Sequence, residues 1–166
     1  RNPVSLKVSE QIIDKMNFKH FMLKEIYDQP QTAKNWLENY LFKNSENGQY
    51  QINYPFDTKF FESIERIEII ACGTSKHAAM VGSFLLEQFS GVPTNVYYAS
   101  EFRYSPPPLL PNTLTIGVTQ SGETADTIAA IDMEIKRRSS IEDKKFAPNL
   151  IAITNRKESS IGRQVF

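Results

Sequence analysis

Short segments of mainly apolar residues recur from residue 67 onward, with the length and composition of buried strands. There are four of them, at 67–71, 95–99, 114–118 and 150–154. Helical spacing of apolar residues follows the first and the third segment. Because strands that alternate with helices form parallel sheets with both faces covered, we predict an α/β fold. The predicted architecture is a doubly wound parallel sheet flanked by helices, of the flavodoxin or Rossmann type, with an N-terminal helical extension.

The spacing of apolar residues also outlines the helices that cover this sheet. The first ends before Gly91, and its predicted inner face is Ala78, Val81, Leu85 and Phe89. The second helix is predicted to face the sheet with Ile128, Ile131 and Ile135. Residues 100–112 are rich in proline and predict an irregular connection with a short helical turn at 100–103. Ser159 and Ser160 are predicted to cap a last helix.

The part of the chain before the first strand carries weaker patterns. Residues 18–42 have helical spacing that Pro30 is expected to break or kink, which predicts a pair of aromatic-rich helices that cover one edge of the sheet or pack on a second subunit. Residues 44–55 are polar and predict a loop, and residues 58–65 predict a short helix. This region is therefore expected to be structural rather than part of a site.

The ends of the chain indicate a piece of a longer polypeptide. Residues 1–17 are polar, lack an initiator methionine, and predict a linker from a preceding domain, with a short helix after Ser9. Residues 18–166 have about the length of one domain. The last predicted helix stops at Phe166, so we expect this domain to be truncated at its C-terminal end.

Composition excludes several classes of function. Lys and Arg together number 19, as do Asp and Glu, so no net charge recruits nucleic acid or an anionic membrane. The single cysteine, Cys72, excludes an internal disulfide and a cysteine-based metal cluster. The sequence has no signal-peptide pattern, and no apolar run approaches the ~20 residues that a membrane span needs. We therefore predict a cytoplasmic protein whose ligand is held by a local site.

Two segments share one pattern: a buried strand, then small hydroxyl residues with a glycine, then a helix. They are Cys72–Ser75 and Thr119–Thr124. Free N–H groups and the helix dipole at such a turn suit an anion, most often a phosphate. The candidate phosphate-binding residues are Thr74, Ser75, Thr119, Gln120, Ser121 and Thr124. The alternative is a pair of unrelated helix caps. Glu123 would repel a phosphate, so we expect its carboxylate to point away or to bond backbone amides.

The other reactive residues favour neither catalysis nor metal binding. Cys72 is predicted to be a small buried apolar residue rather than a nucleophile. His20 and His77 have no partners at metal-ligand spacing, so we predict no metal site. Glu101 and Arg103 are predicted to form a solvated ion pair or a contact between subunits. Nothing in the sequence supplies a positioned general base, and no catalytic residue is assigned.

The second turn, Thr119-x-Ser-Gly-x-Thr, also resembles the loop with which flavodoxins bind the phosphate of FMN. In flavodoxins that loop follows the first strand, whereas here it follows the third. A flavin ring would also need flanking aromatic residues, and only Tyr104 is an obvious candidate. We therefore predict no cofactor.

Several motifs together resemble the sugar isomerase (SIS) domain of the glutamine–fructose-6-phosphate aminotransferase family. They are Lys24–Pro30, Cys72–Ser75, Ala99–Tyr104 and Gln120–Thr127. Their order matches that family, and the resemblance covers residues 18–166. The second turn alone would indicate only a phosphosugar-binding SIS module.

The resemblance implies a role in making glucosamine 6-phosphate from fructose 6-phosphate and glutamine. It implies that the six candidate residues hold the sugar phosphate, with Thr119 in place of the more usual serine, and that the chain forms a homodimer. In this family, glutamine hydrolysis and the lysine that forms a Schiff base belong to other domains. We therefore expect this chain to bind phosphosugar weakly and not to turn it over. The rival interpretations are a non-catalytic phosphosugar sensor and a ketose or aldose phosphate isomerase.

Overall fold

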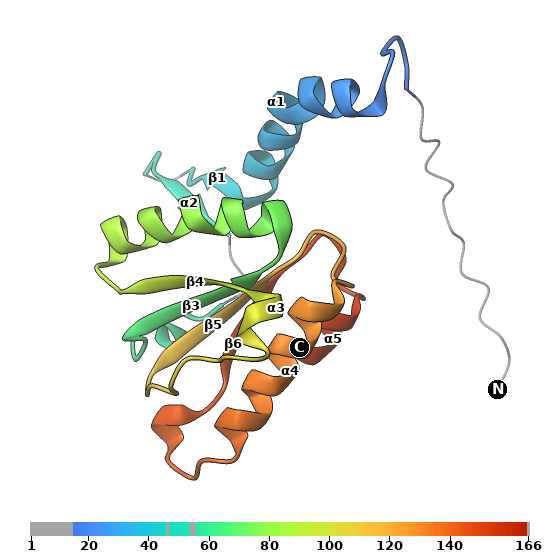
Figure 1. The fold of residues 1–166 in the computed structure, drawn as a ribbon. Helices are drawn as coiled ribbons and strands as arrows, with labels where there is room; N and C mark the ends of the chain where they lie inside the picture. Colours follow the sequence, from blue (N-terminus) through green and yellow to red (C-terminus); the bar gives the residue numbers. More distant parts are fainter. Residues whose placement is uncertain (1–14, 46, 54–55, 166) are drawn as a thin grey trace, which may run out of the picture. The chain divides into compact units, whose positions relative to one another are not determined.

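The computed structural model describes residues 15–45, 47–53 and 56–165 (Figure 1). The chain divides into two compact units, of which the first ends at Phe56 and the second starts at Asp57. The start that the sequence predicted for the SIS domain, residue 18, therefore lies in the first unit. The helix predicted after Ser9 lies outside the described residues.

The first unit contains one long helix where the sequence predicted two. Helix α1 runs over Phe21–Tyr40 with Pro30 inside it, and it bends along its length (Figure 1). Of the two outcomes predicted for Pro30, a break or a kink, the break does not occur, because a proline removes only one backbone hydrogen bond when the flanking turns stay helical. Beside the proline, the hydroxyl of Thr32 donates to the carbonyl oxygen of Asp28 (3.1 Å).

A small hairpin follows α1 where the sequence predicted the end of the helical segment and a polar loop. Strands β1 (Leu41–Lys43) and β2 (Tyr50–Ile52) pair in antiparallel fashion. Gly48, at a φ of 69°, lies in the turn between them. The short helix predicted at 58–65 is only a 3₁₀ turn, η1 (Thr58–Phe60).

The second unit is built on a parallel sheet of four strands, as the sequence predicted. These are β3 (Arg66–Ala71), β4 (Thr94–Tyr98), β5 (Thr113–Val118) and β6 (Asn149–Ile153). Their order is β4-β3-β5-β6, so the chain starts in the interior of the sheet and adds strands on both sides. This arrangement confirms the α/β fold class.

Helices cover both faces of this sheet (Figure 1). They are α2 (Gly73–Ser90), α3 (Ala99–Phe102), α4 (Ala125–Ser139) and α5 (Ser160–Val165). Successive residues of β3 face opposite sides: Ile69 packs in the cluster that contains Ala79 of α2, and Ile70 packs in the one that contains Ile131 of α4. The short helical turn predicted at 100–103 is confirmed by α3.

The prediction for the inner face of α4 is confirmed, but the one for α2 is wrong. Ile131 is fully buried, with Ile128 and Ile135 packed against the same cluster. In α2 the four predicted positions are all exposed, among them Phe89 at 80%, and Ala79 is the buried residue. Apolar residues surround α2 on nearly all sides, so their spacing does not tell which stripe meets the sheet.

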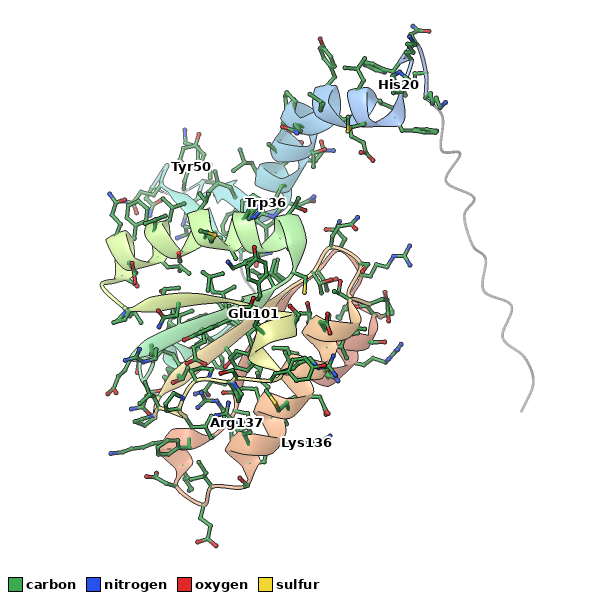
Figure 2. The ribbon with its side chains drawn as sticks, in the orientation of Figure 1. His20, Trp36, Tyr50, Glu101, Lys136 and Arg137 are labelled. Carbon is green, nitrogen blue, oxygen red and sulfur yellow. The ribbon has the colours of Figure 1, made fainter. Side chains whose placement is uncertain are left out.

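Three charged side chains are buried between the sheet and α4. Arg138 donates from Nε to Glu134 Oε1 (2.7 Å), and its Nη2 lies 4.0 Å from Glu68 Oε2 on β3. Its Nη1 donates to the carbonyl oxygen of Leu110 (3.1 Å). The neighbouring Arg137, labelled in Figure 2, donates to Glu134 and to the carbonyl oxygen of Pro107. The network therefore fastens the proline-rich connection to α4.

Glu68 makes the stability of this network depend on pH. Glu68 is 2% exposed, and burial, together with the charge of Glu134, raises its pKa above the usual value. A raised pKa means that the folded chain binds this proton more tightly than the unfolded chain does. The Glu68 contribution to stability is therefore fully present below the unfolded pKa of about 4.3 and is lost as pH rises through the folded pKa.

Glu68→Gln is expected to be more stable than wild type at pH 7, because it avoids the cost of a buried ionised carboxylate. The difference between the two free energies of unfolding should shrink as the pH is lowered and vanish below about pH 4. Urea unfolding of both proteins from pH 4 to pH 7 measures this. A difference that does not change with pH would contradict the raised pKa.

In the part of the chain that is described, no helix has the length and apolar character needed to cross a membrane.

Candidate functional site

All the strands of the sheet end at one level. Ala71 of β3 is paired with Tyr98 of β4 and with Val118 of β5, and Val118 is paired with Ile153 of β6. The segments that follow these residues therefore start side by side at the carboxyl edge of the sheet. In open α/β sheets this edge is where ligands bind. Both hydroxyl-rich turns therefore open on the same edge of the sheet.

The first turn is shorter than the sequence predicted. Helix α2 starts at Gly73, so Thr74 and Ser75 lie in its first turn rather than in a loop before it. Cys72 is the N-cap, and among the described residues no side chain caps the helix and no acidic residue lies in its first turn. Thr74 is exposed and Ser75 is half-buried. The amides at this end of an 18-residue helix thus present a positive dipole without a compensating charge.

The second turn has a buried base and an exposed tip. Thr119 is 2% exposed, and its Oγ1 lies 2.8 Å from Oγ1 of Thr124, the N-cap of α4. Gln120 and Ser121 are exposed. The hydroxyl oxygen of Ser121 accepts from the backbone N–H of Glu123 (3.1 Å), which leaves its own proton available to a ligand. The two threonines therefore hold the turn closed while Gln120 and Ser121 face outward.

A glycine lets this turn pack closely against the segment after β6. Gly122 has a φ of 72°, and a Cβ atom built on it would lie 2.0 Å from the Oγ of Ser159. Its carbonyl oxygen accepts from the N–H of Ile161 (3.2 Å). Both the backbone conformation and the contact require a residue without a side chain.

The carboxylate of Glu123 is turned away, as the sequence led us to expect. It accepts from the backbone N–H of Ser160 (2.8 Å) and from the hydroxyl of Ser160 (2.7 Å), at the start of α5. These two hydrogen bonds lower the pKa of Glu123, because they favour its ionised form. Its charge is thus used to cap α5 and to hold the turn.

Asp126 is a residue of this edge that sequence reasoning missed. It lies in the first turn of α4, and its Oδ1 is 2.6 Å from Nη1 of Arg103. Arg103 therefore pairs across the fold with Asp126 rather than with the nearby Glu101. The two partners are 23 residues apart, and no spacing rule connects them.

A cavity of about 260 Å³ opens beside the end of β4. Its lining includes Lys76, Tyr98 and Glu101, the last of which is labelled on α3 in Figure 2. The Nζ of Lys76 lies 3.7 Å from the centroid of the Tyr98 ring. Lys76 follows Ser75 directly, so it adds a cation beside the first turn that the sequence did not single out.

The structure brings the two candidate turns to neighbouring strands, and a side-chain contact links the segments that follow these strands. The hydroxyl of Thr127 in α4 lies 3.9 Å from the Sγ of Cys72. Cys72 is half-buried and His77 is exposed on α2. That the six candidate residues surround one phosphate stays a prediction.

Comparison with known proteins places these observations in a family. The SIS domain model matches residues 60–165. A glutamine–fructose-6-phosphate aminotransferase (isomerizing) of Thermosynechococcus vestitus is 52% identical over 99% of this chain, and one of Synechocystis sp. is 48% identical over 98%. The chain spans 26% of the length of each. The structure also resembles the solved C-terminal domain of glucosamine-fructose-6-phosphate aminotransferase from Francisella tularensis, with a TM-score of 0.72 and 33% sequence identity. The match covers 90% of this chain and 38% of that one.

Proposed function

Because this chain belongs to the SIS domain family, we propose that its carboxyl edge binds the phosphate group of a hexose phosphate. The observation that carries the proposal is the common level at which β3 and β5 end, which sets the two turns next to each other. The first turn offers the amides of an uncapped helix, and the second offers the free proton of Ser121. Both groups can donate hydrogen bonds to the oxygens of a phosphate dianion.

We propose fructose 6-phosphate as the sugar and glucosamine 6-phosphate synthesis as the pathway step. Relatives with the aminotransferase name match nearly the whole chain, including residues that precede the 60–165 matched by the family model. This extended match favours an aminotransferase over a phosphosugar sensor or a plain sugar phosphate isomerase.

In this proposal the chain contributes by positioning rather than by bond-making. Thr74, Ser75, Gln120 and Ser121 hold the phosphate, and the remainder of the sugar is thereby oriented at the edge of the sheet. Thr119 and Thr124 support the turn from beneath. We propose that this is one part of the isomerase half of a longer enzyme that works as a homodimer.

Ser121→Ala is expected to weaken binding of fructose 6-phosphate roughly tenfold, because a hydrogen bond to a charged phosphate is lost. NMR titration of the chain with fructose 6-phosphate, and separately with fructose, measures this even when binding is weak. Wild type should respond at Ser121 and Thr124 to the phosphorylated sugar alone.

Ser63→Ala is the matched control, because Ser63 is an exposed serine that precedes β3 and so lies away from the carboxyl edge. Equal responses of wild type to fructose and to fructose 6-phosphate would contradict the proposed function. Tighter binding of an aldose phosphate would favour the isomerase interpretation instead.

A further inference from the structure

The carboxylate of Asp126 lies in an unfavourable place for a phosphate site. Asp126 is two residues after Thr124, the N-cap of α4, and so belongs to the first turn of the helix that the second turn leads into. In the absence of a ligand, an acidic side chain there stabilises the helix, because it lies near the positive end of the helix dipole. For the same reason it competes with, and repels, a phosphate dianion bound at that end.

Arg103 opposes this charge from another element. It is the C-cap of α3, and its guanidinium forms the 2.6 Å contact with Asp126 described above. The side chains are 36% and 42% exposed, so the pair stands at the surface of the edge rather than in the core. The other carboxylate of the turn, Glu123, is already held by Ser160. Both acidic groups at this turn are therefore engaged away from a ligand.

We propose that Arg103 is a positioning residue for phosphosugar binding, which acts by neutralising and turning aside the carboxylate of Asp126. This inference rests on the proposed function. It does not require Arg103 to touch the sugar phosphate. If the Arg103–Asp126 pair served only to join α3 to α4, its loss would not change phosphosugar binding through charge.

A double-mutant cycle tests this role. Arg103→Ala is expected to raise the Kd for fructose 6-phosphate roughly two- to fivefold, because Asp126 is left uncompensated at the helix end. Arg103→Ala combined with Asp126→Asn should return the Kd to the wild-type value or below, because the repelling charge is gone. Arg103→Lys should stay near wild type. The defect of Arg103→Ala should shrink as salt is added, because added ions screen the exposed Asp126 carboxylate.

The matched control is a second exposed pair at the other end of the same helix. Lys136, labelled in Figure 2, lies 2.6 Å from Asp132 on α4. At the rise of an α-helix, Lys136 is about 15 Å along the axis from Asp126. Lys136→Ala changes the net charge by the same amount and should leave the Kd unchanged.

The outcomes separate the inference from the function on which it rests. A double variant that binds as weakly as Arg103→Ala would overturn the inference, since the arginine would then act by contact or by structure. An unchanged Kd in Arg103→Ala would overturn it as well, with the proposed function intact. If wild type fails to distinguish fructose 6-phosphate from fructose, the proposed function fails first and the inference with it.

Discussion

Replacing Arg138 with methionine is expected to lower the free energy of unfolding by about 3–5 kcal/mol. Methionine keeps most of the buried volume but removes the charge that compensates Glu134, which is 0% exposed, and Glu68, which is 2% exposed. It also releases the carbonyl oxygen of Leu110. The loss is large because carboxylates that stay buried without a partner must either pay for desolvation or take up a proton.

Urea unfolding at pH 7 measures this effect, with Lys136→Met as the control. Lys136 is on the same helix and is also paired with a carboxylate, but its side chain is 74% exposed, so we expect a change within about 0.5 kcal/mol. Adding Glu134→Gln to Arg138→Met should recover part of the loss, because it removes a buried carboxylate that would keep only one of its two arginine partners, Arg137. Equal stabilities for Arg138→Met and Lys136→Met would show that the buried network contributes little.

Gly122→Ala is expected to cost about 2–4 kcal/mol, since it combines a left-handed backbone with a steric clash. The new Cβ would meet the Oγ and Cβ of Ser159 at 2.0 Å and 2.3 Å. Ser159 is buried, and its hydroxyl donates to the carbonyl oxygen of Arg156 (2.6 Å), so it has little freedom to withdraw. The turn must then shift, and the NMR response to fructose 6-phosphate should be lost with it.

Gly91→Ala isolates the backbone part of this cost. Gly91 ends α2 at a φ of 69°, close to that of Gly122, but a Cβ built there meets nothing within 4 Å. We expect it to cost only about 1 kcal/mol and to leave phosphosugar binding unchanged. If Gly122→Ala is no more destabilising than Gly91→Ala, the clash between the new Cβ and Ser159 contributes nothing to the cost, and this prediction is wrong.

Local sequence was sufficient for the strands and for the positions of the two turns, although not for the length of the first turn. The four apolar segments became the four strands of the sheet, and Ile131 is buried as the spacing predicted. The behaviour of Glu123 could also be anticipated, because a carboxylate beside an anion site needs another partner. These features depend on residues close together in the chain, where the period of a helix or strand connects sequence to burial.

Local sequence failed where several arrangements satisfied the same pattern. Helix α2 has apolar residues on most of its surface, and only the packing of Ala79 against the sheet decided which side is buried. Pro30 was compatible with a break or with the bent helix that forms. In each case the local energies of the alternatives are close, so contacts made elsewhere decide between them.

The sequence by itself determined the α/β class, the hydroxyl-rich turns after the first and third strands of the sheet, and the family that they resemble. Only the tertiary structure decided that Arg103 pairs with Asp126, that Arg138 lies against Glu68, and that Gly122 packs on Ser159. The physical reason is that these contacts join residues from different elements. Their partners are chosen by the order and register of the strands, β4-β3-β5-β6, which no short stretch of the chain encodes.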